Sequence, residues 1–105
     1  MVIEWLKFRV EPSKREEFVR KDALVWTATL AHYPGFLGKE VWLDPHNLES
    51  TVLIIHWKTR EQWKAIPQDI LERTEAKMQQ AMGDVYEMVE SREYQILHFG
   101  IMNNE

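Results

Sequence analysis

The chain has 105 residues, a formal net charge of −4, and 45% hydrophobic and 29% charged residues, including five tryptophans. This length suits one domain, and the aromatic content argues against a disordered chain. The lack of cysteine excludes disulfides and cysteine-ligated metal centres, and the acidic balance argues against nucleic acid as a partner. No apolar run approaches the roughly 18 residues that cross a bilayer, so we expect a cytoplasmic protein without a membrane partner.

The first quarter of the chain predicts a strand followed by a long helix. Residues 2–10 alternate between apolar and polar side chains, which is typical of a strand with one buried face. Ser13 and Glu16 have the spacing of a capping box, which predicts the start of a helix. Pro34 and Gly35 end that helix after Tyr33.

The middle of the chain predicts a β-hairpin. Residues 36–44 and 51–58 indicate two strands, the second rich in β-branched residues, and the turn between them contains Pro45. The capping-box spacing recurs at Thr59 and Gln62, and Pro67 suits the first turn of a second main helix. Gly83 ends this helix.

Residues 93–99 predict a fourth strand, and residues 100–105 a flexible tail. The whole of 1–99 therefore forms a single domain of order βαββαβ. Right-handed crossovers place both helices on one face of a four-stranded antiparallel sheet, the ferredoxin-like α+β fold. Residues 52–57 are apolar on both faces of their strand, so the second face of the sheet needs a cover. A second copy of the chain supplies it, which predicts a homodimer.

Three segments carry a family resemblance: 2–5 (VIEW), 34–38 (PGFLG) and 56–63 (HWKTREQW). With them the chain resembles the dimeric α+β barrel superfamily, within it the antibiotic-biosynthesis-monooxygenase-like branch, and most closely a cyanobacterial-type family of similar size. The resemblance implies ferredoxin-like subunits, a homodimer whose sheets form a barrel, and ligand pockets between sheet and helices. Members include cofactor-free oxygenases of polycyclic phenols, haem degraders, isomerases and stress-linked proteins, so the fold transfers and the function does not.

The chain lacks the residues that haem-degrading members share. Haem-degrading members that resemble this chain carry an asparagine on strand one, and a tryptophan and an axial histidine on the second helix. This chain has Trp5 or Leu6 at the first position, and Ile66 and Ala76 at the other two. Haem degradation of that kind is therefore not expected, and no cofactor is predicted.

Asp22 lies in the middle of the apolar stripe of the first helix, which also includes Phe18 and Trp26. A carboxyl group buried there has a raised pKa or finds a donor, and a raised pKa suits a general base. The structural alternative is that Asp22 accepts a hydrogen bond that fixes the helix against the sheet.

His56 lies within the apolar third strand and is predicted to act as a base, if it faces the helices and meets Asp22. The alternative is a core or interface histidine. The four histidines lack the HxH or HxxxH spacing of a metal site, so none is predicted.

The remaining candidates are ligand-binding residues. Trp26 shares the stripe with Asp22, and Tyr33 continues it, while Glu40 and Trp42 share one face of the second strand. Large aromatic residues most often fill cores and interfaces, which is the structural alternative for each tryptophan.

These patterns predict a homodimer with a pocket between the first helix and the sheet for a small apolar or aromatic molecule. As an enzyme it would be a cofactor-independent oxygenase or isomerase, with Asp22 or His56 removing a proton. The alternative is a non-catalytic dimeric binding or stress-response module.

Overall fold

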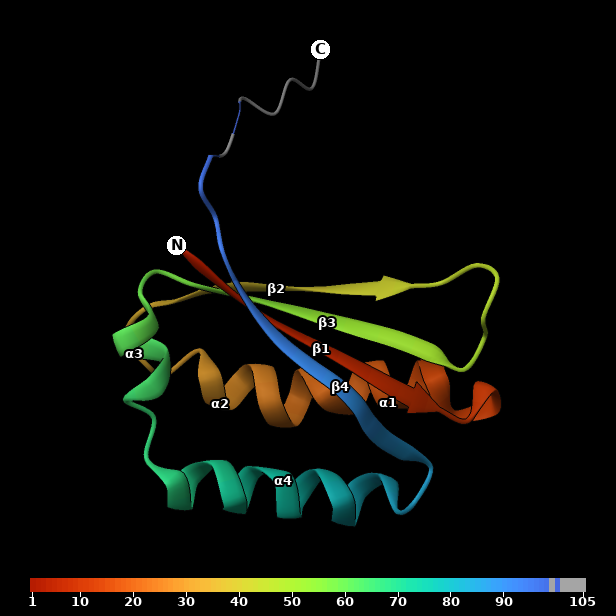
Figure 1. Ribbon diagram of the computed structural model, residues 1–105. Helices are drawn as coiled ribbons and strands as arrows, with labels where there is room; N and C mark the ends of the chain where they lie inside the picture. The colour runs from red at the N-terminus through yellow and green to blue at the C-terminus, as the bar shows by residue number, and fades with distance from the viewer. Residues whose placement is uncertain (99, 101–105) are drawn as a thin grey trace.

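The computed structural model describes residues 1–98 and Gly100. Four antiparallel strands form one sheet in the order β2-β3-β1-β4. Helices α1, α2 and α4 cover one side of it (Figure 1), so the ferredoxin-like α+β fold is confirmed. The strands are β1 (Val2–Val10), β2 (Phe36–Leu43), β3 (Ser50–Trp57) and β4 (Tyr86–Gln95). The helices are α1 (Arg15–Asp22), α2 (Ala28–Leu30), α3 (Arg60–Lys64) and α4 (Gln68–Met82).

The first helical stretch is built from several kinds of turn. A 3-10 turn at Pro12–Lys14 leads into α1, and a π-helical segment at Ala23–Thr27 joins α1 to α2. The predicted capping box at Ser13 is wrong, because neither helical start has a side-chain cap. A main-chain hydrogen bond begins the helical stretch instead of a side-chain cap. The Lys14 N–H donates to the Glu11 carbonyl at 2.8 Å, in a turn tighter than that of an α-helix.

The start of α3 and the end of α4 follow the sequence signals. Thr59 Oγ1 accepts a hydrogen bond from the Gln62 N–H at 3.1 Å, and Gly83 ends α4 with a φ of +71°. Gly35 has a φ of +93°, and a Cβ there would lie 2.4 Å from Gln62 Oε1. The turn before β2 therefore needs glycine for both its conformation and its close approach to α3.

The predicted start of the fourth strand is wrong. β4 begins at Tyr86 and pairs with β1 along the sheet edge, with an irregularity between Lys7 and Phe8. Charged residues on both of its faces hide the apolar alternation, and such charges protect edge strands from pairing with other chains. Phe99 lies outside the described residues, as does the predicted tail except Gly100.

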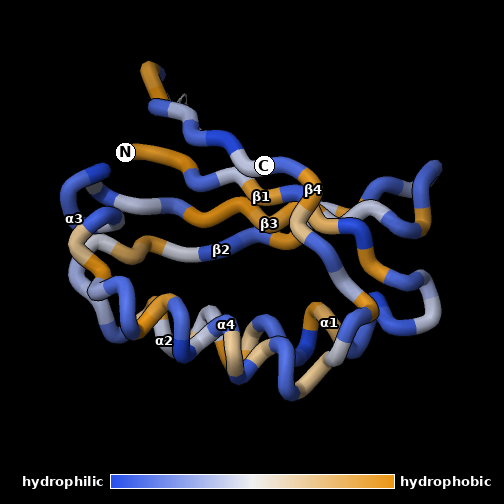
Figure 2. The backbone as a smooth tube through the Cα atoms, turned by 60° about the horizontal axis from the view of Figure 1, so that its bottom comes forward, coloured by the Kyte–Doolittle hydropathy of each residue, from blue (hydrophilic) through white to orange (hydrophobic). Residues whose placement is uncertain are grey.

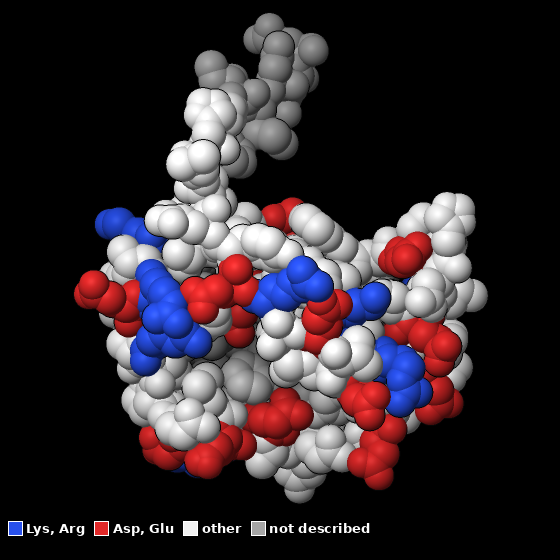
Figure 3. Space-filling view, viewed as in Figure 1, with Lys and Arg blue, Asp and Glu red and all other residues white. Residues whose placement is uncertain are grey.

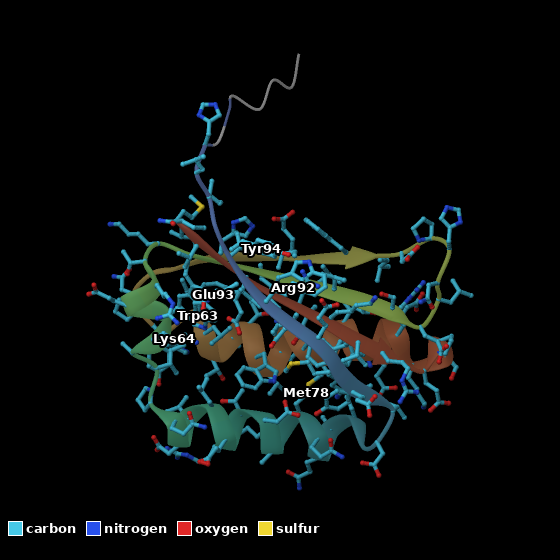
Figure 4. All side chains as sticks on the ribbon, viewed as in Figure 1. Trp63, Lys64, Met78, Arg92, Glu93 and Tyr94 are labelled. Atoms are coloured by element: carbon cyan, nitrogen blue, oxygen red, sulfur yellow. The ribbon has the colours of Figure 1, made fainter. Side chains whose placement is uncertain are left out.

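The register gives the sheet two different faces. The helix-facing side forms the core, in which β3 is the main hydrophobic strand (Figure 2) and Met78 of α4 packs beneath the sheet (Figure 4). The side without helices is called the open face here. Core side chains include Phe8, Val10, Phe18, Leu30, Leu53, Ile55, Trp57, Ile66 and Met78. Among the described residues, no helix is long and apolar enough to cross a membrane.

Candidate functional site

A cavity of about 340 Å³ lies between the helices and the sheet. Its walls are mostly apolar and aromatic, with charged side chains at a few positions. This combination is typical of small-molecule sites, in which apolar walls supply affinity and a few polar groups fix orientation. The charged lining residues are Glu4, Asp22, Lys39, Lys64 and Glu75, and the tryptophans are Trp26, Trp57 and Trp63.

Asp22 and Lys39 form a buried ion pair on the cavity wall. Lys39 Nζ contacts Asp22 Oδ2, and the two side chains are only 5% and 4% exposed. Burial raises the pKa of the Asp22 carboxyl group, and the lysine ammonium opposes that rise. Both charged groups are buried away from water, so each depends on the other for electrostatic stabilisation. Removing one partner would leave a buried charge without compensation.

Glu4 is the second carboxyl group of this wall. It lies in the same cross-strand row as Lys39, since both residues pair with Ile55 of the strand between them. Its Oε1 accepts a hydrogen bond from the Trp57 indole N–H at 3.2 Å. Burial raises the pKa of Glu4, while the Trp57 bond and the charges of Lys39 and Lys64 lower it.

A third carboxylate comes from α4. Glu75 Oε1 accepts from the Trp26 indole N–H at 3.2 Å, and Glu75 Oε2 accepts from the Tyr86 hydroxyl at 2.7 Å. Burial and the neighbouring carboxylate raise the pKa of Tyr86 well above its usual range. The Glu75 side chain thus fixes the indole of Trp26 at the cavity wall.

The π-helical segment positions residues on this wall. It begins directly after Asp22 and contains Trp26, and both side chains line the cavity. Thr29 Oγ1 donates back to the Val25 carbonyl at 2.8 Å, which supports the widened turn. Single π turns inside α-helices occur frequently at functional sites.

Helix α3 closes one end of the cavity. Figure 4 shows Trp63 and Lys64 there, and Lys64 Nζ lies 4.1 Å from the centroid of the Trp63 ring. Arg60 binds Glu93 of β4 through two hydrogen bonds of 2.7 and 3.2 Å, which tie α3 to the sheet edge. A hollow bordered by acidic and basic side chains lies between β4 and α4 (Figure 3).

The fold has counterparts among known proteins. The family model for antibiotic biosynthesis monooxygenases matches residues 1–68, more than half of the chain. The chain belongs to this family. The predicted branch is thus confirmed, and no protein of curated function matches the chain by sequence.

Solved structures with this fold cover almost the whole chain. The cofactor-independent oxygenase SnoaB from Streptomyces nogalater is 18% identical, with a TM-score of 0.66 over 93% of this chain and 94% of that chain. The haem degrader MhuD from Mycobacterium tuberculosis, solved with two haems in its active site, is 18% identical. Its TM-score is 0.68, over 95% of this chain and 99% of that chain. HapK from Hahella chejuensis is 22% identical, with a TM-score of 0.68 over 99% of this chain and 100% of that chain. At such identities the likeness shows the fold alone.

The structure separates the predicted site residues into three groups, in the cavity, on the open face and in the core. Asp22 and Trp26 line the cavity, as expected. His56 does not meet Asp22, and that prediction is wrong: its Nε2 lies 2.5 Å from Glu40 Oε2 on the open face. Trp42 donates to Glu40 Oε1 at 3.3 Å on this same face, away from the cavity.

Tyr33 packs against the hydrophobic core and is not among the residues that line the cavity. Leu6 and Ile66, two of the residues predicted to replace the haem degraders' side chains, are apolar lining residues of the cavity. No group of three or more histidine, aspartate or glutamate side chains in the described part of the chain is placed to hold a metal ion.

Sequence reasoning missed Lys39 and Glu4. Glu4 continues the apolar row of Leu6 and Phe8 on β1, and a charged residue in such a row was the available signal. Lys39 gave a weaker signal, because residues 36–43 do not show which face of their strand is buried.

Proposed function

We propose that this protein binds a small apolar or aromatic molecule in the cavity and removes a proton from it. The observation that carries the proposal is the charged group of Glu4, Lys39 and Asp22 on the wall of an otherwise apolar cavity. A carboxyl group with a raised pKa serves as a base near neutrality, and a nearby ammonium stabilises the anion that forms. Membership of a family named for monooxygenases supports an oxidative outcome.

The cavity suits a small fused-ring compound. Its volume of about 340 Å³ lies at the lower end of the range for ligand pockets, roughly 300–1,000 Å³. Three indole rings on its wall offer flat surfaces against which an aromatic ligand stacks.

Two reactions follow from removal of a proton from carbon. In an isomerisation, the proton returns to a different atom of the same molecule. In an oxygenation, the carbanion passes electrons to dioxygen: a ring CH₂ becomes C=O, and the two hydrogens leave with the second oxygen atom as water. Either reaction needs only the substrate and, in the second case, dioxygen.

The open face supports the predicted homodimer. Trp42 and Tyr94 are 51% and 48% exposed there, beside the half-buried Trp5 and Val52. Exposed aromatic side chains on a sheet indicate an interaction site, and two-fold pairing of identical sheets covers them on both copies. We propose this face as the dimer interface, which gives His56 and Glu40 a place at the interface rather than in the cavity.

Binding is tested with anthrone, whose ring CH₂ is acidic and flanked by aromatic rings. We expect anthrone to quench tryptophan fluorescence, and Trp26→Phe to weaken binding several-fold. The control Trp42→Phe removes an indole from the open face and leaves binding unchanged. Turnover is then followed by oxygen uptake, with one dioxygen consumed for each anthraquinone formed.

The alternative is a non-catalytic binding or stress-response module. It is favoured by Asp22 being already paired with Lys39, which satisfies this carboxylate without any ligand. Tight anthrone binding without oxygen uptake or proton exchange would support the alternative, and absence of binding would contradict both functions.

A further inference from the structure

The two deepest carboxyl groups of the cavity differ in their partners. Asp22 is held by the ammonium group of Lys39. Glu4 forms no ion pair with the described residues, and its one hydrogen bond, from Trp57, uses Oε1. None of the hydrogen bonds found among the described residues uses its other oxygen, Oε2, and the Glu4 side chain lines the cavity. A carboxyl oxygen in this position is available to a ligand.

Charged groups of several neighbouring elements surround Glu4, and Glu75 of α4 lines the same cavity. Lys39 approaches from β2 and Lys64 from α3, and both lower its pKa against the effect of burial. Glu93 is its register partner on β4 and is neutralised by Arg60. Asp22 lies beyond Lys39 and shares that lysine's charge. The ammonium groups of Lys39 and Lys64 thus lie near Glu4, but neither forms an ion pair with it in the described residues.

Resting on the proposed function, we infer that Glu4 is the residue that accepts the proton from the ligand. Lys39 is placed to stabilise the oxygen on which negative charge develops. Asp22 is a positioning residue, because its ion pair fixes the ammonium group at the cavity wall.

The step has a defined balance for a ligand with a C–H bond next to a carbonyl group. The C–H bond breaks, and its electron pair forms a carbon–carbon double bond. The carbonyl oxygen becomes an enolate oxygen close to Lys39, and the proton moves to Glu4 Oε2. Return of the proton to the same carbon restores the ligand, so the step is visible as exchange with solvent hydrogen.

The experiment measures this exchange with 2-tetralone in D₂O by proton NMR. We expect the protein to accelerate loss of the signals next to the carbonyl group, with a rate that rises as Glu4 ionises. Glu4→Gln should lower the rate by about 10²-fold, the usual contribution of a positioned base. Glu4→Asp should restore part of it. Glu87→Gln is the matched control, since Glu87 pairs with Arg9 at the surface and should not change the rate.

Asp22→Asn separates the base from the positioning residue. It frees Lys39 to approach Glu4, which lowers the pKa of Glu4, so we expect exchange to persist with its midpoint shifted to lower pD. Circular dichroism checks that each variant is folded. Loss of exchange in Asp22→Asn together with full exchange in Glu4→Gln would overturn the inference and assign the base to Asp22.

Fluorescence quenching by 2-tetralone keeps two kinds of failure apart. Binding without accelerated exchange in the unaltered protein would overturn the role of Glu4 and leave the binding function intact. Absence of binding by both 2-tetralone and anthrone would overturn the proposed function, and the role of Glu4 with it.

Discussion

The two faces of the sheet each hold a carboxylate beside a basic side chain, in very different surroundings. On the helix-facing side, the side chains of Asp22 and Lys39 are 4% and 5% exposed, and burial raises the pKa of the aspartate. On the open face, the side chains of His56 and Glu40 are 25% and 52% exposed, and the hydrogen bond to His56 lowers the pKa of the glutamate. Pairing is common to both, so burial decides the direction in which the pKa of each carboxyl group shifts.

The largest effect should come from removing the buried cation. Lys39→Met leaves Asp22 without a partner in the core, and breaking a buried ion pair costs about 3–5 kcal/mol of unfolding free energy. Urea unfolding at neutral pH measures the loss. The double variant Asp22→Leu with Lys39→Met is the control, because it removes both charges and should recover most of the stability. Equal stability of the single variant and the parent would mean that the pair is not buried in solution.

The next effect concerns the open face. Trp42→Glu places a charge on the proposed dimer interface, and we expect it to separate the two copies. Light scattering should give about twice the chain mass of 12.6 kDa for the parent and the chain mass itself for the variant. Because Trp42 is exposed in one chain, the variant should keep its fold. A parent that is monomeric at micromolar concentration would refute the interface.

A smaller effect with a defined sign concerns Glu4. Its pKa in the folded protein is raised above the ordinary value of 4.5, so the folded state binds the proton more tightly than the unfolded state. This penalty is absent below pH 4.5, grows as pH rises through the raised folded pKa, and then stays constant. Glu4→Gln removes it, so we expect the variant to gain stability relative to the parent as pH rises from acid to neutral.

Chemical unfolding at several pH values tests this expectation. Glu40→Gln is the control on the open face, where the lowered pKa gives a stabilising contribution that is present at neutral pH and lost on acidification. The two variants should therefore change the pH dependence in opposite directions. If both variants changed the pH dependence of the unfolding free energy in the same direction, the proposed difference between the two faces would be wrong.

The smallest effect should come from His56. Its pair with Glu40 is partly exposed to solvent, and such pairs contribute roughly 0–1 kcal/mol. We expect His56→Gln to change the unfolding free energy of a single chain by less than about 1 kcal/mol. Anthrone binding should not change, because His56 lies on the face away from the cavity. Loss of binding in this variant would show that the open face takes part in the ligand site.

The sequence determined the fold through signals that act locally. Thr59 caps its helix, Gly83 ends one, and Gly35 provides a conformation that other residues rarely adopt, so these boundaries follow from nearby residues alone. The periodic apolar stripe of the first helix likewise placed Asp22 and Trp26 on its buried side. Together with the family resemblance, these signals were sufficient for the architecture.

The tertiary structure decided which charged groups meet. Lys39 reaches Asp22, and Glu4 joins their row, only because β2, β3 and β1 pair in one register. In a strand, a shift of one residue moves every side chain to the opposite face, and an apolar stretch such as β3 does not show which face His56 occupies. The sequence thus determined the elements and their order, while the strand register decided the chemistry of the cavity.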